Sequence, residues 1–148
     1  MQSNTITHIF ENVYIGNEDD AKDFSLMKSL GITHILIAGK YMDKHFPNDF
    51  TYFQIDIADR IDQDLDLYFD ECNQFIKESG KVLVHCVMGK SRSPAIVIGY
   101  LISVKGMDFQ DALDLVKKKR FITNPNKNFL ENLKYLDSKR KAKEINKF

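Results

Sequence analysis

Hydrophobic residues along the chain fall into two patterns, short continuous runs and longer stretches with the helical period. The continuous runs predict strands buried on both faces, at residues 32–38, 52–57 and 81–85. A shorter run predicts one more strand, at residues 13–15. Helical periodicity begins near Asp19 or Asp20, at Leu65, at Ser93, at Asp108 and at Asn128. Strands that alternate with helices indicate an α/β domain with a largely parallel sheet.

Residues that favour helix ends lie at the expected boundaries. Gly31 is predicted to end the first helix, and Asp108 is predicted to cap the helix whose end carries three consecutive lysines. The last helix is expected over residues 128–137. The chain is therefore predicted to form one domain over residues 1–137, followed by a basic, frayed tail over residues 138–148.

The composition excludes several classes of protein. The chain has 148 residues, 43% of them hydrophobic, and its 21 basic residues balance 21 acidic ones. This balance gives no global attraction to nucleic acid or membranes, and no run approaches the ~20 apolar residues of a membrane span. Two cysteines and four scattered histidines make neither a disulfide framework nor a zinc set, so no metal and no cofactor are expected. A reducing compartment, the cytoplasm or the nucleus, is the expected location.

Candidate chemistry concentrates between the strand at residues 81–85 and the helix at residues 93–104. The connecting loop contains Cys86, Gly89 and Arg92. A loop that enters a helix in this way turns its backbone N–H groups toward one point, where the helix dipole adds positive charge. Arg92 can add a bidentate fork to two phosphate oxygens. The loop is therefore predicted to hold a phosphate group.

The position of Cys86 adds a reaction to this binding site. Because Cys86 begins the loop, its sulfur is predicted to lie beneath the bound phosphorus. Such electropositive surroundings favour the thiolate form of a cysteine at neutral pH, and a thiolate is a strong nucleophile. The alternative, a buried cysteine at a strand end beside a surface arginine, leaves the glycine and the strand–loop–helix context unexplained.

The run His85-Cys86-x-x-Gly89-x-Ser91-Arg92-Ser93 resembles the signature of the cysteine-dependent protein tyrosine phosphatase superfamily. The compact, atypical dual-specificity phosphatases are the most similar group. The resemblance extends up to about residue 137, through the segments at 12–17, 30–36, 46–47, 81–84 and 124–126. It implies a phosphatase fold in which helices flank both faces of a central, mostly parallel sheet. Departures from the family pattern are found at Ile37, Phe121 and Asn128.

Hydrolysis also requires an acid that protonates the leaving oxygen. The carboxylates near the end of the strand at 52–57 are the candidates: Asp56, Asp59, Asp62, Asp64 and Asp66. In the family the acid follows a strand of pattern Ile-x-Ile-x-Asp, which selects Asp59, with Asp62 as the reserve. Asp56 is expected to face solvent, and Asp64 and Asp66 to be helix N-terminal acids.

The resemblance implies a reaction in two steps without a metal. Cys86 attacks phosphorus while Asp59 donates a proton, and Asp59 then activates water to hydrolyse the phosphocysteine. The phosphate oxygens are expected to be bound by the Arg92 guanidinium and by the backbone N–H groups of the loop, those of Val87, Met88, Gly89, Lys90, Ser91 and Arg92.

Three residues of the predicted site have two interpretations each, and a fourth is expected to act indirectly. Ser93 either donates a hydrogen bond to the thiolate or caps the helix. His85 is expected to point away from the substrate and to orient the loop. Asn126 either braces the loop or only shapes a turn, and Lys90 is either a surface residue or a contact for a second acidic group. Cys72 follows the apolar stripe of its helix and is expected in the core.

Three rival functions share features with this sequence. A nucleotide-binding P-loop fails because it requires glycine where Val84 stands. A phosphate-binding module without turnover, and a phosphatase acting on a phosphoinositide, an RNA end or a glucan, remain alternatives. The preferred hypothesis is a monomeric enzyme that acts on phosphoproteins, because the resemblance implies a shallow cleft that admits phosphoserine and phosphothreonine as well as phosphotyrosine.

Overall fold

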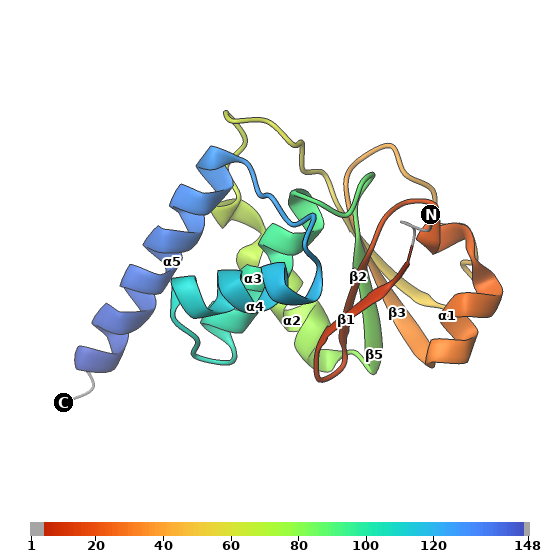
Figure 1. Ribbon diagram of the computed structural model, residues 1–148, viewed down its shortest axis with the longest axis horizontal. Helices are drawn as coiled ribbons and strands as arrows, with labels where there is room; N and C mark the ends of the chain where they lie inside the picture. Colours follow the sequence, from red (N-terminus) through yellow and green to blue (C-terminus); the bar gives the residue numbers. More distant parts are fainter. Residues whose placement is uncertain (1–4, 147–148) are drawn as a thin grey trace.

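The computed structural model describes residues 5–146, which form a five-stranded sheet with helices on both faces (Figure 1). The strands are β1 (Thr7–Phe10), β2 (Val13–Gly16), β3 (Ile32–Ala38), β4 (Thr51–Ile55) and β5 (Lys81–His85). Their order across the sheet is β1-β2-β5-β3-β4. Only β1 runs antiparallel to its neighbour, so the predicted mostly parallel sheet is confirmed.

The strand predictions differ in accuracy. β3 and β5 have the predicted bounds, whereas β4 begins one residue earlier than predicted and ends two residues earlier. β1 was not predicted, because its four residues are only partly buried and do not form a continuous apolar run. β5 lies in the centre of the sheet, between β2 and β3, and therefore carries its C-terminal end into the middle of the molecule.

Five α-helices surround the sheet: α1 (Phe24–Leu30), α2 (Phe69–Glu78), α3 (Arg92–Ser103), α4 (Phe109–Lys119) and α5 (Lys127–Ile145). Figure 1 shows α1 on one face of the sheet and the other four helices on the opposite face. Helix α3 is buried from Ser93 to Ile102, which explains its continuous apolar sequence. No helix within residues 5–146 combines the length and the apolar character that crossing a bilayer would need.

The start of α1 differs from the prediction. Asp19 and Asp20 do not open this helix; Asp20 instead begins the short 3-10 helix η1 (Asp20–Lys22). The side chain of Asp23 caps α1 by accepting a hydrogen bond from the Leu26 N–H at 3.0 Å. At the other end, Gly31 adopts a φ of +80°, which only glycine accepts readily, and ends the helix as predicted. Similarly, the periodic stretch from Leu65 begins with a second 3-10 helix, η2 (Asp66–Tyr68), before α2.

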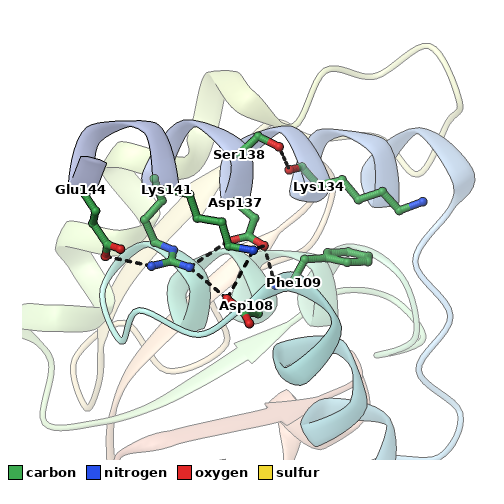
Figure 2. Close-up of polar contacts among 8 residues, drawn as sticks. Asp108, Phe109, Lys134, Asp137, Ser138, Lys141 and Glu144 are labelled. Atoms are coloured by element: carbon green, nitrogen blue, oxygen red, sulfur yellow. Dashed lines mark hydrogen bonds and ion pairs between the residues drawn. The ribbon is translucent and has the colours of Figure 1, made fainter. Parts of the chain in front are cut away.

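The cap of α4 comes from a different residue than predicted. Asp108 occupies the capping position, but its side chain accepts no capping hydrogen bond. Asp137 of α5 supplies the cap, because its Oδ2 accepts the Phe109 N–H at 2.9 Å (Figure 2). The Asp108 carboxylate instead forms ion pairs with Arg140 and Lys141, at 3.3 and 3.4 Å. These contacts fasten α5 to the start of α4.

The last helix is longer than predicted. It was expected to end at Asp137, yet α5 continues to Ile145, so residues 138–145 form a helix rather than a frayed tail. The reason is a set of ion pairs along one side of the helix, in which Arg140 contacts Asp137 at 3.0 Å and Glu144 at 2.9 Å (Figure 2). Residues 147–148 of the expected tail lie outside the described residues.

Candidate active site

The loops that follow β2, β3, β4 and β5 gather at one edge of the sheet, at the top in Figure 1. This is the edge where the carboxyl ends of parallel strands lie, and where α/β folds place their ligands. Cys86 directly follows β5, and the loop at residues 86–91 leads into α3 at Arg92. The predicted context of strand, loop and helix is therefore present.

The Cys86 sulfur lies at the centre of this loop and is surrounded by hydrogen-bond donors. Its residue is only 2% exposed. The Sγ atom accepts the backbone N–H groups of Gly89 at 3.3 Å and Ser93 at 3.5 Å. It also lies 3.2 Å from the Ser93 hydroxyl. Two backbone N–H groups and one hydroxyl therefore converge on this sulfur.

A cavity of about 240 Å³ opens above this sulfur. Its walls are formed by Asp59, Cys86, Val87, Met88, Lys90, Ser91 and Arg92. Most of the predicted phosphate-binding residues therefore share one cavity with the predicted nucleophile and the predicted acid. Lys90 is exposed at this wall, and its backbone carbonyl accepts the Asn124 N–H at 2.7 Å.

Two hydrogen bonds to a single carboxylate oxygen anchor Asp59, one from the loop and one from the start of α5. Its Oδ1 accepts the Ser91 hydroxyl at 2.7 Å and the Asn126 side-chain amide at 3.0 Å. The backbone N–H of Asn126 donates to the same Ser91 hydroxyl at 3.1 Å. Asn126 also caps α5 by accepting the Phe129 N–H at 2.9 Å. The contacts of Asn126 thus tie α5, the acid loop and the 86–91 loop together.

The reserve acid, Asp62, does not reach the cavity. It is exposed and receives two hydrogen bonds from the Arg60 guanidinium, at 2.9 and 3.1 Å. The side-chain hydrogen bond from Arg60 lowers the pKa of Asp62 below its ordinary value. Asp56 is also exposed, as expected, and lies 3.8 Å from Lys40. Of the five candidate carboxylates, only Asp59 lines the cavity above Cys86.

A residue that sequence reasoning missed, Arg120, supports the loop from behind. It is 5% exposed, and its Nε donates to the Gly89 carbonyl at 2.7 Å. Its Nη1 donates to the Thr7 hydroxyl at 2.7 Å and to the Thr5 carbonyl at 3.1 Å. Gly89 has a φ of +67°, and a Cβ there would lie 2.7 Å from the Gly16 carbonyl oxygen. The loop can therefore approach Arg120 and β2 so closely only with glycine at this position.

Charge also surrounds Arg120. Burial lowers the pKa of its guanidinium, while the negative charges of Asp20 and Cys86 oppose that effect. Burial also disfavours the charged form of Asp20 and therefore raises the pKa of that carboxyl. The Asp20 carboxylate accepts the Asn17 N–H at 2.9 Å. The signal for Arg120 in the sequence was its spacing of four residues after Val116, which continues the buried stripe of α4. Arg120 directly follows three lysines, so this spacing does not stand out in the sequence.

His85 is fully buried and does not line the cavity. Its Nδ1 lies 3.3 Å from the Cys86 carbonyl oxygen. Burial lowers the pKa of His85 to about 4, so its imidazole is neutral at physiological pH. Arg92 is half-buried, and its Nη1 donates to the Ile57 carbonyl at 3.3 Å. No group of three His, Cys, Asp or Glu side chains suited to a metal ion occurs within residues 5–146.

The second cysteine, Cys72, is buried in α2 at 0% exposure, as expected for a core residue. Burial raises the pKa of its thiol to about 12. Cys72 and Cys86 are both free thiols.

A buried thiol surrounded by N–H donors, beside an arginine and a carboxylate, defines the site of a cysteine-dependent phosphatase. Comparison with known proteins agrees with this class. A family model described as the dual specificity phosphatase catalytic domain matches residues 13–139. The chain belongs to the dual specificity phosphatase family.

Individual relatives support the same assignment. Dual specificity protein phosphatase 1B of Arabidopsis thaliana is 38% identical over 136 residues, which cover 89% of this chain and 81% of that protein. The crystal structure of DUSP15 has a TM-score of 0.82 at 31% identity and covers 99% of this chain and 98% of its own. The human tyrosine phosphatase-like serine/threonine/tyrosine-interacting protein has a TM-score of 0.84 at 29% identity, covering 97% of this chain and 99% of that one. The fold is thus shared by proteins named as phosphatases and by one named as phosphatase-like.

Proposed function

We propose that this dual specificity phosphatase domain hydrolyses phosphotyrosine and phosphoserine or phosphothreonine in proteins through a phosphocysteine formed on Cys86. One observation carries the proposal. The Cys86 sulfur lies in a cavity whose walls also include Arg92 and the anchored carboxylate of Asp59. Nucleophile, phosphate ligand and proton donor therefore face the same small space.

In the first step the Cys86 thiolate attacks phosphorus in line with the leaving oxygen. A sulfur–phosphorus bond forms as the phosphorus–oxygen bond to the substrate breaks, and Asp59 gives its proton to that oxygen. Because Oδ1 of Asp59 is occupied by Ser91 and Asn126, Oδ2 is the atom that carries the proton. The loop N–H groups and the Arg92 guanidinium stabilise the charge on the phosphate oxygens.

In the second step a water molecule attacks the phosphocysteine. The Asp59 carboxylate takes a proton from this water, the sulfur–phosphorus bond breaks, and inorganic phosphate forms. The Cys86 thiolate leaves as an anion, stabilised by the Ser93 hydroxyl at 3.2 Å and by the two N–H groups that point at it. Ser93 therefore acts on the departure of the thiolate more than on its attack.

Dual specificity is supported by the rim of the cavity, where Val87 and Met88 are exposed. A short phosphoserine side chain can therefore reach the sulfur as well as a long phosphotyrosine. The two free cysteines support a reducing compartment, the cytoplasm or the nucleus, as the place where the enzyme acts on phosphoproteins.

Rapid acid quenching during turnover of a phosphotyrosine peptide tests this proposal. The expected result is phosphate bound covalently to the peptide that contains Cys86, together with release of inorganic phosphate from phosphotyrosine and phosphoserine peptides. Cys86→Ser is expected to bind the phosphopeptide without turnover.

Other outcomes would assign other functions. Binding without any turnover by the wild-type chain would indicate a phosphate-binding module. Turnover of p-nitrophenyl phosphate and of an inositol phosphate, a 5′-phosphorylated RNA or a phosphorylated glucan, but of no phosphopeptide, would keep the chemistry and overturn the protein substrate.

A further inference from the structure

A second cleft, of about 270 Å³, lies directly beside the catalytic cavity. The two share Val87 and Arg92 as a common wall. The remaining lining residues come from the loops after β2, β3 and β4, and they are Glu18, Lys40, Tyr41, Met42, Asp56, Ile57 and Ala58. The proposed reaction uses none of these residues.

The shared wall relates this cleft to the substrate. Consecutive residues of an extended peptide are about 3.8 Å apart between their Cα atoms. A phosphopeptide with its phosphate above Cys86 therefore places the side chain of a residue close in its sequence near the wall formed by Val87. The cleft is thus positioned to receive a side chain of the substrate.

The charges of the cleft favour a cation. Glu18 is half-buried, and its carboxylate forms no ion pair with the described part of the chain. Its backbone N–H donates to the Val87 carbonyl at 3.1 Å, which fixes Glu18 against the catalytic loop. Asp56 and Lys40 are paired at 3.8 Å, and both are exposed. Because the bound phosphate neutralises Arg92, the cleft keeps an excess of one negative charge.

The apolar part of the cleft favours a long side chain. Met42, Ile57 and Ala58 provide aliphatic surface. Tyr41 is 89% exposed at the opening, and the Lys40 Nζ already lies 5.5 Å from the centroid of its ring. The aliphatic surface is therefore the part that favours a long basic side chain, because it suits the methylene groups of arginine or lysine.

We propose that this cleft binds an arginine or lysine adjacent to the phosphorylated residue of the substrate, with Glu18 as the residue that determines this specificity. The inference rests on the proposed function, since it concerns the substrate of the same site. It assigns to the enzyme a preference for phosphorylation sites with a basic neighbour. A second phosphate near Lys40 is the competing occupant.

Matched phosphotyrosine peptides test the proposal, with arginine, alanine, glutamate or phosphothreonine placed in turn on either side of the phosphotyrosine. Within each enzyme variant, the ratio of kcat/KM between the arginine and alanine peptides is measured. The wild-type chain is expected to prefer arginine on one side by about fivefold, mainly through KM. Glu18→Gln should reduce this ratio to about one, and Glu18→Lys should shift the preference to the glutamate peptide.

The control variant is Glu71→Gln, because Glu71 is exposed on α2 and does not line either cavity. It should keep the wild-type ratio. No preference for arginine, or a preference for phosphothreonine that Lys40→Gln removes, would overturn the inference while leaving the proposed function intact. Failure of the wild-type chain to hydrolyse p-nitrophenyl phosphate would instead refute the proposed function.

Discussion

The two cysteines of this chain are almost equally buried, yet their surroundings are opposite. Cys72 is 0% exposed within the apolar face of α2, and burial raises the pKa of its thiol to about 12. Cys86 is 2% exposed, but two backbone N–H groups and a hydroxyl converge on its sulfur. Burial alone therefore raises the pKa of the Cys72 thiol, whereas the equally buried Cys86 sulfur has hydrogen-bond partners on several sides.

The apolar interior and the donor-rich loop meet between two consecutive residues, His85 and Cys86. His85 lies at the end of β5 in the dry interior, where burial holds the pKa of its imidazole at about 4. Cys86 is the next residue and belongs to the loop of N–H donors. The change occurs where the strand ends and the backbone turns toward α3, with Gly89 at a φ of +67°.

Replacing each cysteine in turn gives the largest expected contrast. Cys86→Ser should lower kcat for p-nitrophenyl phosphate by more than about 10⁴-fold, because a neutral hydroxyl is a poor nucleophile at this position. Cys72→Ala should keep the wild-type kcat, since Cys72 lies in the core and outside the cavity. Steady-state assays of both variants measure the contrast. Turnover by Cys86→Ser near the wild-type rate would exclude a phosphocysteine intermediate on Cys86.

Replacing Asp59 tests the carboxylate that shares the cavity with Cys86. Asp59→Asn is expected to slow hydrolysis of a phosphoserine peptide by about 100-fold to 1000-fold, because the alkoxide must be protonated as it leaves. The loss should be smaller for p-nitrophenyl phosphate, whose phenolate leaves readily. Asp62→Asn is the matched control and should retain activity, since Asp62 is paired with Arg60 away from the cavity. If Asp62→Asn lost the activity instead, the acid would be wrongly assigned.

The sequence predicted those parts of the fold and site that local patterns determine. The buried strands β3 and β5 were predicted with their bounds, because continuous apolar runs flanked by glycine and polar residues have few interpretations. The loop between β5 and α3 was predicted for the same reason, together with the family resemblance. Cys86, Ser91 and Arg92 accordingly lie in one cavity with Asp59.

Features that depend on contacts between distant segments were not predicted. The cap of α4 comes from Asp137 of α5, and the brace behind Gly89 comes from Arg120. No local pattern identifies such a partner, because the two residues of each pair are about 30 positions apart. The same holds for β1, which forms an edge strand by pairing with β2.

The buried histidine next to Cys86 gives the domain a pH-dependent stability. Well above pH 6.5 the imidazole of His85 is neutral in both the folded and the unfolded chain. As the pH falls from 6.5 to about 4, the imidazole binds a proton in the unfolded chain but not in the folded chain. The reason is that the pKa of His85 is lowered to about 4 in the folded chain. The free energy of unfolding should therefore decrease over this range by up to about 3 kcal/mol.

Urea unfolding of the wild-type chain and of His85→Gln at pH 7.0 and at lower pH, in steps down to about pH 4.5, measures this effect. The variant should lose less stability than the wild-type chain over that interval. Other titrating groups, including the buried Asp20, are common to both chains and cancel in the difference. Equal losses in the two chains would show that His85 titrates normally in the folded state.

The smallest expected effect isolates one donor around the Cys86 sulfur. Ser93→Ala removes the hydroxyl that lies 3.2 Å from Sγ and leaves both backbone N–H donors in place. Hydrolysis of the phosphocysteine should slow by about tenfold, since one hydrogen bond to the departing thiolate is lost. Formation of the phosphocysteine should change less, so that a burst of p-nitrophenol precedes slow turnover. Ser103→Ala, at the exposed end of the same helix, should show no such burst. The helix-cap alternative for Ser93 is excluded, because Ser91 is the N-cap of α3. Equal slowing of both steps in Ser93→Ala would mean that the hydroxyl does not act on the departing thiolate, and that the backbone alone distinguishes Cys86 from Cys72.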